Sequence, residues 1–487
     1  MKKRIVIILF VFTVLFQTLY AAGISENACG NHKTATPVKY MFLFIGDGMS
    51  LAQVSSAEIF TALQTSDDFR PKRLNFSQFP VTGLATTCDA SSFITDSASA
   101  ATAIATGNKT LSGVINMDTD KKEKFKTIAE YAHDAGMKVG IVSSVTINHA
   151  TPAAFYAKVP SRNDFYDIAL QLVQSNFEYF GGGCIDQRKG ENGLQQDAVE
   201  IALANGYTYV DTHEAFNNLG PGTGKVIVVS PVLQDSGTMP YEIDRKPHEL
   251  SLADFTRKGI ELLDNPRGFF MMVEGGKIDW ACHANDAATV IRDVLALDEA
   301  VKEAIDFAKQ HPAETLIVVT GDHETGGMSL GFSSTQYSVF PEKIALQKLS
   351  YVAFNEEVLE PYRDNTRPAD AKLEDILPAI KESFGIDFES LTVYQKQQLE
   401  FAFQRSMGDK QIRAFAEDNY ILYGGYEPLT VKITQIVAQT SGIGWTSYSH
   451  TGLPVPVFAF GGNHELFSGY YDNTDLFRKM FEVMDLQ

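Results

Sequence analysis

The chain has 487 residues, of which 44% are hydrophobic, so it can bury a sizeable core and wholesale disorder is excluded. Its 41 basic and 60 acidic residues give a formal net charge of -19. Nucleic-acid binding relies on basic contacts with phosphates, so we expect no nucleic-acid partner for this acidic protein. An excess of carboxylates is instead compatible with cation binding.

Residues 1–22 have the pattern of a secretory signal peptide. Basic residues at 2–4 precede an apolar run at 5–16, and small residues follow at 21–23. This pattern predicts a secreted or periplasmic protein. An uncleaved membrane anchor is the alternative, although the apolar run is short for a span, and we expect no stable membrane span after cleavage.

The four cysteines are Cys29, Cys88, Cys184 and Cys282. In an exported protein they are able to pair, but their spacing predicts neither a metal knuckle nor a connectivity. Cys29 lies near the expected mature N-terminus, so a lipid-modified cysteine is an alternative. The residues that precede it make a poor lipidation site.

The first predicted element of the fold is a buried strand at residues 41–45, which are all apolar. A Gly-Asp-Gly sequence follows it, so Asp47 is expected at the carboxyl end of the strand, where open α/β sheets bind ligands. An aspartate that merely forms a turn is the alternative. A helix is predicted over 51–63.

A helix made almost wholly of Ala, Ser and Thr is predicted within residues 95–107, beyond a β-rich run at 81–87. Ser97 follows Asp96 near the start of this helix, where backbone N–H groups favour an anion. This is a suitable position for a nucleophile that attacks a negatively charged group. The alternative is a buried small-residue helix with Asp96 or Ser97 as its cap.

Helices and buried strands continue to alternate along the chain, which predicts a doubly wound α/β domain. The further helices are expected at residues 125–136, 162–174, 194–205, 252–263, 285–309, 430–439 and 475–484, and the further strands at 138–143, 226–229, 268–273, 315–319 and 456–460. Residues from about 330 to 435 interrupt this alternation. We interpret them as a partly helical insertion that shapes the mouth of a pocket, builds a dimer contact, or does neither.

Acidic residues and histidines gather at the ends of these predicted strands. Glu274 ends one strand, and Asp322 and His323 end another. Asp279 and His283 are four residues apart, so a helical turn would place them on one face. His450 lies in a predicted loop, 447–452, before the last strand. Carboxylates with histidines suit zinc or a similar divalent ion, and two such ions are able to stabilise both oxygens of a displacement.

Several motifs together resemble those of the alkaline phosphatases, which are metal-dependent phosphomonoesterases. The matching motifs lie at residues 45–49, 95–100, 150–153 with 161–162, 273–279 with His283, 320–323 and 450–452. The resemblance implies an α/β three-layer sandwich, with a large mostly parallel central sheet flanked by helices. The family domain would cover residues 38–487, with the insertion at about 330–435. Phosphate monoesters as substrates and a homodimer are also implied.

The resemblance implies two zinc ions and one magnesium ion. The implied ligands are Asp279, His283 and His450 for one zinc, Asp47, Asp322 and His323 for the second zinc, and Asp47, Glu274 and Thr151 for magnesium. Ser97 would form a phosphoserine intermediate, and Arg162 would hold two phosphate oxygens with its planar fork. An acidic chain needs such metals and such an arginine to bind a phosphoryl dianion.

Two positions differ from the best-known bacterial pattern. His149 stands where many bacterial members have Asp, and Trp280 stands where they have Lys. A histidine beside the third metal would admit zinc in place of magnesium. Trp280 is interpreted as a pocket-wall or packing residue, and direct contact with substrate is the alternative.

Other functions on the same fold are a phosphodiesterase, a sulfatase, or a metal-binding scaffold without activity. Arg162 and three metal positions favour a monoester dianion. A sulfatase would have its nucleophile in a C/S-x-P-x-R pattern, whereas Ser97 is followed by Ala-Ser-Ala. No matched ligand position is lost, which argues against an inactive scaffold.

Overall fold

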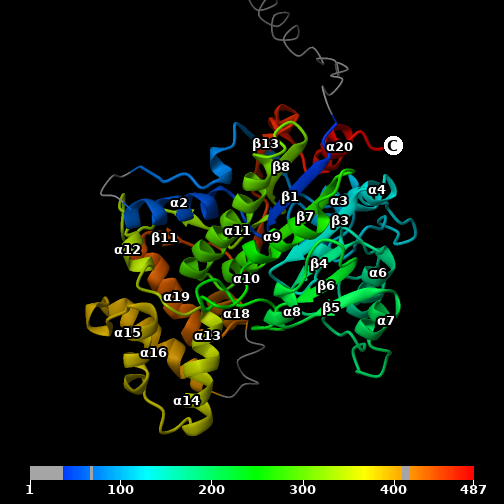
Figure 1. The fold of residues 1–487 in the computed structure, drawn as a ribbon. Coiled ribbons are helices and arrows are strands. Elements are labelled where there is room, and N and C mark those ends of the chain that lie inside the picture. Colours follow the sequence, from blue (N-terminus) through cyan, green and yellow to red (C-terminus); the bar gives the residue numbers. More distant parts are fainter. Residues whose placement is uncertain (1–36, 66–69, 409–416) are drawn as a thin grey trace, which may run out of the picture. The chain divides into compact units, whose positions relative to one another are not determined.

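A ten-stranded sheet forms the centre of the fold, in the order β14-β2-β13-β8-β1-β7-β3-β4-β6-β5 (Figure 1). The computed structural model describes residues 37–65, 70–408 and 417–487. The predicted signal peptide and Cys29 lie outside these residues. Within them, no helix combines the length and apolar character that crossing a membrane requires. Cys88, Cys184 and Cys282, the cysteines of the described ranges, are all unpaired.

The sheet is almost entirely parallel, and β13 is the strand that runs against its neighbours β8 and β2. The strands are β1 (Tyr40–Gly46), β2 (Val81–Thr86), β3 (Lys138–Ser143), β4 (Tyr179–Gly182), β5 (Tyr207–Val210), β6 (Lys225–Val229), β7 (Phe269–Gly275), β8 (Thr315–Gly321), β13 (Val455–Gly461) and β14 (Gly469–Asp472). Two short pairs add β9 (Glu324–Thr325) with β12 (His450–Thr451), and β10 (Ser329–Leu330) with β11 (Ile443–Gly444).

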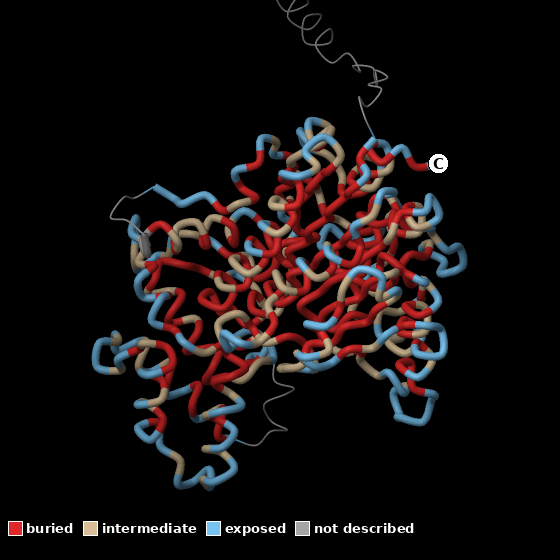
Figure 2. Tube along the Cα trace, in the orientation of Figure 1, coloured by how far each residue is buried: buried red, intermediate tan, exposed pale blue. Residues whose placement is uncertain are grey.

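Each face of the sheet has its own hydrophobic core, because successive side chains of a strand point to opposite faces. In β1, Phe42 and Phe44 enter one core, whereas Leu43 and Ile45 enter the other. Figure 2 shows the central strands as buried along their length, with the exposed segments at the periphery. Two cores around one sheet are the three-layer arrangement that the family resemblance implies.

Helices cover both faces. The core that contains Leu43 is completed by α3 (Ser97–Thr106), α4 (Ile128–Asp134), α5 (Ala150–Ala153), α6 (Phe165–Ser175), α7 (Ala198–Ala204) and α20 (Thr474–Val483). The core that contains Phe42 is completed by α2 (Leu51–Thr65), α8 (His213–Asn217), α9 (Leu252–Leu263), α10 (Lys277–His283) and α11 (Ala287–Ala308).

Residues 330–435 are largely helical. They form α12 (Pro341–Ile344), α13 (Tyr351–Phe354), α14 (Glu360–Asn365), α15 (Leu377–Phe384), α16 (Val393–Met407) and α18 (Glu417–Tyr423), and the segment ends within α19 (Pro428–Ser441). Phe354, Leu399 and Ile433 join the core on the Phe42 side of the sheet. This segment therefore packs on one layer of the sandwich.

Some strands are absent from the sequence prediction. β4 contains two glycines, which weaken any strand pattern, while β5 and β14 are short strands at the two edges of the sheet. The prediction of a loop at 447–452 is also partly wrong, because His450 and Thr451 pair with β9 as a short antiparallel strand. Two residues are too few to leave a periodic pattern in a sequence.

Candidate active site

The strand ends that carry the predicted ligands are adjacent in the sheet. Ile45 of β1 lies opposite Thr320 of β8 and opposite Glu274 of β7. Asp47 and Asp322, each two residues beyond these strand positions, are fully buried at the same edge. Because all these strands run in parallel, the order β8-β1-β7 assembles the acidic residues from three distant parts of the chain.

The first group of ligand atoms comes from Asp279, His283 and His450. Asp279 and His283 are one turn apart on α10, and His283 Nε2 lies 3.3 Å from Asp279 Oδ2. His450 Nε2, from β12, lies 3.7 Å from Asp279 Oδ1. The two histidines therefore present Nε2 to opposite oxygens of one carboxylate.

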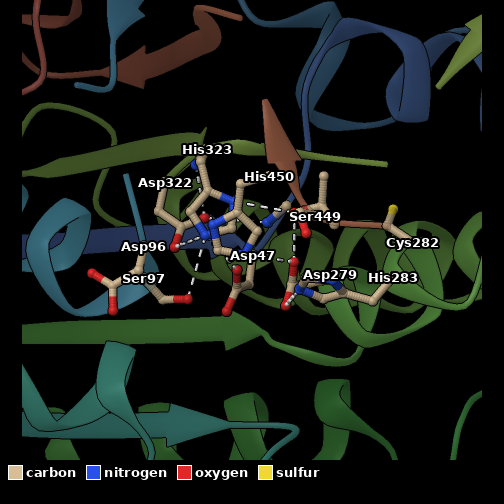
Figure 3. Close-up of polar contacts among 12 residues, drawn as sticks. Asp47, Asp96, Ser97, Asp279, Cys282, His283, Asp322, His323, Ser449 and His450 are labelled. Atoms are coloured by element: carbon tan, nitrogen blue, oxygen red, sulfur yellow. Dashed lines mark hydrogen bonds and ion pairs between the residues drawn. The ribbon is translucent and has the colours of Figure 1, made fainter. Parts of the chain in front are cut away.

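The second group comes from Asp47, Asp322 and His323. His323 Nε2 lies 3.4 Å from Asp47 Oδ1 and 3.3 Å from Asp322 Oδ2. The rings of His323 and His450 stack with their centroids 3.6 Å apart, so the first and second groups are neighbours. Figure 3 shows these side chains converging on a small space beside Ser97.

A third group comes from Asp47, His149 and Glu274. Glu274 accepts a short hydrogen bond from Ser143, and its other oxygen has no hydrogen-bond partner among the described residues. Thr151, the remaining predicted ligand, is fully buried on α5, and its hydroxyl also lacks a described partner. His149 is thus a member of the third group, in agreement with the expectation that it lies beside the third metal.

Hydrogen bonds fix the orientation of the three histidines of the first two groups. His283 Nδ1–H donates to the Tyr448 carbonyl at 2.5 Å, and His450 Nδ1–H donates to the Thr95 carbonyl at 2.8 Å. Thr325 donates to Asp279 at 2.5 Å, which leaves its oxygen free to accept from His323 Nδ1 at 3.2 Å. Each Nε2 is thereby directed at carboxylates, as in histidines that bind metals.

The site contains buried carboxylates whose negative charge bound cations would balance. Both oxygens of Asp47 and Oδ2 of Asp322 are buried without a hydrogen bond from any described residue. Burial, followed by the neighbouring carboxylates, raises the pKa of Asp47 and of Asp322 well above the ordinary value. Burial also raises the pKa of Glu274 to about 7. Unpaired buried carboxylates are costly, and divalent cations among them would remove that cost.

Within the first group, the carboxylate and the histidines shift one another's pKa values. Burial alone would raise the pKa of Asp279, but His283 and His450 hold it well below the ordinary value. Burial alone would lower the pKa of His283, but the neighbouring Asp279 raises it to about 9. A proton on His283 therefore occupies part of the position that a cation would take.

Ser97 is the first residue of α3 and is 2% exposed. Its hydroxyl lies 3.3 Å from His323 Nε2 (Figure 3). Asp96 caps the helix by accepting from the Ser99 N–H at 3.0 Å, and Gly107 ends it in the left-handed conformation, with φ of 71°. All ten helix residues are buried, so their small side chains bring α3 close to its neighbours.

Asp96 also positions Arg162. Arg162 Nη1 lies 3.0 Å from Asp96 Oδ2, and Arg162 Nη2 lies 3.2 Å from His149 Nε2. Burial would raise the pKa of Asp96, but Arg162 and the hydrogen bonds from Ser99 keep that pKa below its ordinary value. The guanidinium is thus held beside Ser97 by a charged carboxylate that belongs to none of the three ligand groups.

Ser97 and Arg162 open into one cavity of about 320 Å³. The other lining residues are His149, Asp235, Asp279, Trp280, His283, Tyr351, Tyr426 and His450. Trp280 is thus a wall of the cavity, next to His149. Asp235, Tyr351 and Tyr426 were not predicted from the sequence. Asp235 lies in a turn, and the two tyrosines lie in the segment 330–435, where no repeated spacing marks them.

Comparisons with known proteins agree with this geometry. A family model described as alkaline phosphatase matches residues 38–486. Alkaline phosphatase 3 of Bacillus subtilis is 29% identical over 99% of this chain and 97% of its own. Alkaline phosphatase 4 of the same organism is 30% identical, over 94% and 92%.

Two solved structures are also similar. The cold-active alkaline phosphatase of a psychrophilic Shewanella sp. has a TM-score of 0.75 at 29% identity, covering 91% of this chain and 99% of its own. The alkaline phosphatase of Thermus thermophilus has a TM-score of 0.74 at 25% identity, covering 93% of both chains.

Proposed function

Because the chain belongs to the alkaline phosphatase family and is a phosphomonoesterase, we propose that Ser97 is the nucleophile that carries the phosphoryl group. The observation that supports this role best is the position of its hydroxyl. It lies at the N-terminus of α3, between His323 at 3.3 Å and a cavity shared with Arg162. An anion is favoured there by the helix N–H groups and by the guanidinium.

The residues present fit three divalent cations, because buried oxygens of Asp47, Glu274 and Asp322 have no described partner. Asp279, His283 and His450 would hold one zinc, and Asp47, Asp322 and His323 would hold a second. Asp47 and Glu274 with Thr151 would hold magnesium. When bound, the ions supply positive charge to the phosphoryl group and to the attacking and leaving oxygens.

His149 makes zinc the alternative occupant of the third group, since imidazole suits zinc better than magnesium. A solved structure of the TAB5 alkaline phosphatase, 25% identical to this chain, is a histidine-to-glutamate mutant with magnesium bound in its M3 site. In this chain the histidine of the third group is His149. Metal analysis of wild type and of His149→Asp would distinguish the two ions, with more magnesium expected in the variant.

The reaction has two displacements at phosphorus. First, the Ser97 hydroxyl gives up its proton and its oxygen bonds to phosphorus as the ester bond breaks, and the leaving oxygen departs with the electron pair of that bond and takes up one proton. Next, water gives up one proton as its oxygen bonds to phosphorus, the bond to Ser97 breaks, and the Ser97 oxygen takes up one proton. Throughout, Arg162 would hold two non-bridging oxygens with its fork, and Asp96 would keep that fork in place.

The test compares p-nitrophenyl phosphate with bis(p-nitrophenyl) phosphate, with and without chelator. We expect kcat/KM for the monoester to exceed that for the diester by at least about two orders of magnitude. Chelator should abolish turnover, and added zinc and magnesium should restore it. A preference for the diester would favour the phosphodiesterase alternative.

Ser97→Ala tests the nucleophile within the same assay. Its turnover should fall by roughly 10³-fold or more, with metal content unchanged. Ser175→Ala, at the end of the distant helix α6, serves as the matched control. Full turnover by metal-loaded Ser97→Ala would rule out this mechanism.

We also propose that the protein is exported to the periplasm or secreted, and that it forms a homodimer. Export is supported by the signal-peptide pattern of residues 1–22. Fractionation of cells that express the full chain should recover activity outside the cytoplasm, and light scattering should give twice the chain mass. Activity confined to the cytoplasm, or a monomer, would contradict the respective proposal.

A further inference from the structure

The cavity that contains Ser97 has a wall that the phosphoryl chemistry does not use. Asp235, Trp280, Tyr351 and Tyr426 line it together with Arg162. None of these four residues, in the reaction proposed above, touches the phosphoryl oxygens. They are available to the group that leaves with the ester oxygen.

Asp235 is held on this wall by a tight turn. Asp235 has φ of 34° and Ser236 has φ of 57°, which are uncommon values for residues other than glycine. Gln234 and Thr238 pair across the turn, and the Gly237 carbonyl accepts from the Cys184 N–H at 2.7 Å. A backbone conformation of this kind persists only where its surroundings impose it, as at ligand-binding positions.

A buried cation, Lys277, lies beside Asp235, and its Nζ is also 5.1 Å from the centre of the Trp280 ring. Its Nζ lies 3.6 Å from Asp235 Oδ2 and donates to Thr238 Oγ1 at 2.9 Å. The same ammonium interacts electrostatically with Asp244 and Asp293. One lysine is thus shared among three carboxylates, and the side chain of Asp235 stays 22% exposed.

The rest of the wall consists of aromatic side chains that contact neighbouring aromatic rings. The hydroxyls of Tyr351 and Tyr241 are 2.9 Å apart, and the Tyr351 and Tyr426 rings meet edge to face at 5.9 Å. The Trp280 ring meets His149 edge to face at 6.0 Å. Aromatic faces attract cations, and a carboxylate beside them adds to that attraction.

We propose that Asp235, Trp280, Tyr351 and Tyr426 form a subsite for a positively charged leaving group, so that the enzyme favours phosphate monoesters of amino alcohols. This inference rests on the function proposed above. The phosphate would bind at Ser97 and Arg162, and the primary or quaternary ammonium would lie against the aromatic rings and Asp235. Tyr351 and Tyr426 belong to the segment 330–435, which thereby contributes to substrate choice.

The test uses two esters of nearly equal shape, phosphocholine and 3,3-dimethylbutyl phosphate, which differ in the positive charge. For the metal-loaded wild type, kcat/KM for phosphocholine should exceed that for the neutral ester by about tenfold or more. In Asp235→Asn this ratio should fall to about 1–3. The ratio is internal to each variant, so a general loss of activity does not obscure it.

Two further variants complete the design. Tyr426→Leu removes an aromatic face without touching Lys277 and should lower the ratio several-fold. Asp306→Asn makes the same change of charge on the exposed end of α11 and should keep the wild-type ratio. Equal turnover of the two esters by wild type, or an unchanged ratio in Asp235→Asn, would overturn the subsite. Turnover of neither ester would instead overturn the proposed function.

Discussion

At the scale of single residues, the site is defined by which side-chain atoms already have hydrogen-bond partners and which do not. The Nδ1 atoms of His283 and His450 donate to main-chain carbonyls, and Asp96 is committed to α3 and Arg162. What remains free is a set of Nε2 atoms and carboxylate oxygens that face one space. The sequence could predict Asp47, Glu274, Asp322 and His323 because they lie at the ends of buried strands. It could predict Asp279, His283 and His450 because they lie in motifs that resemble those of the family. It could not predict Asp235, whose role depends on a turn in three dimensions.

Arg162 offers the most direct residue-level prediction. Arg162→Ala should lower kcat/KM for p-nitrophenyl phosphate by at least about 100-fold, because two charged hydrogen bonds, each worth about 1.5–3 kcal/mol, would be lost. Steady-state kinetics at saturating zinc and magnesium would measure this. Arg188→Ala, whose arginine pairs with Asp197 outside this cavity, is the control and should behave as wild type. Unchanged kinetics in Arg162→Ala would contradict its role in holding the phosphate.

At the scale of elements, α3 carries the proposed nucleophile, Ser97, and its position depends on small side chains. Its ten residues are all buried, and Ala98, Ala101 and Ile104 pack into the core on one face of the sheet. A larger residue there would push the helix and Ser97 away from His323. The precision of the site therefore depends on packing several residues from the chemistry.

Ala101→Leu tests this dependence. Overpacking a fully buried position costs about 1–3 kcal/mol of folding free energy, so the melting temperature should fall. Because the helix start would move with the helix, kcat should fall as well. Ala204→Leu, at the exposed end of α7, is the control and should change neither quantity. If Ala101→Leu kept the melting temperature and the kcat of the wild type, the proposed dependence of the site on the packing of α3 would be contradicted.

The elements also show what sequence periodicity can predict. The buried strands β1, β7 and β8 are continuous apolar runs, and α9 was predicted with its observed bounds, Leu252–Leu263. β4 and the edge strands β5 and β14 were not predicted, because glycine and short length remove the pattern. Pairing of His450 with β9 depends on residues more than a hundred positions away, which no local pattern reports.

At the scale of the whole molecule, folding brings like charges together, and this has a thermodynamic consequence. Asp47, Asp322 and Glu274 come from different strands, and burial raises the pKa of each. Without metal, these three carboxyls therefore keep protons in the folded state that they release in the unfolded chain above the ordinary carboxyl pKa of about 4. As pH rises through their raised pKa values, to about 7 for Glu274, the loss of these protons destabilises the metal-free protein. The lowered pKa values of His149 and His323 act in the opposite direction, but only below the ordinary histidine pKa of about 6.5.

Chelation should therefore destabilise the protein more at about pH 8 than at about pH 5. The raised pKa of His283, about 9, acts in the same direction, since its proton is lost on further alkalinisation. Each ion contributes on the order of 4 kcal/mol when its concentration is a thousand times its Kd. Calorimetry of the metal-free and metal-loaded forms at the two pH values measures the difference. A gap in melting temperature that narrows toward alkaline pH would contradict this account.

The central claim is that the phosphoryl group passes through Ser97. The most direct measurement is to mix the metal-loaded enzyme with a phosphate monoester, quench it in acid, and map phosphorylation by mass spectrometry. We predict one phosphoryl group on Ser97 in the wild type and none in Ser97→Ala. Phosphate on a different residue, or steady turnover with no phosphorylated enzyme in either protein, would contradict the account.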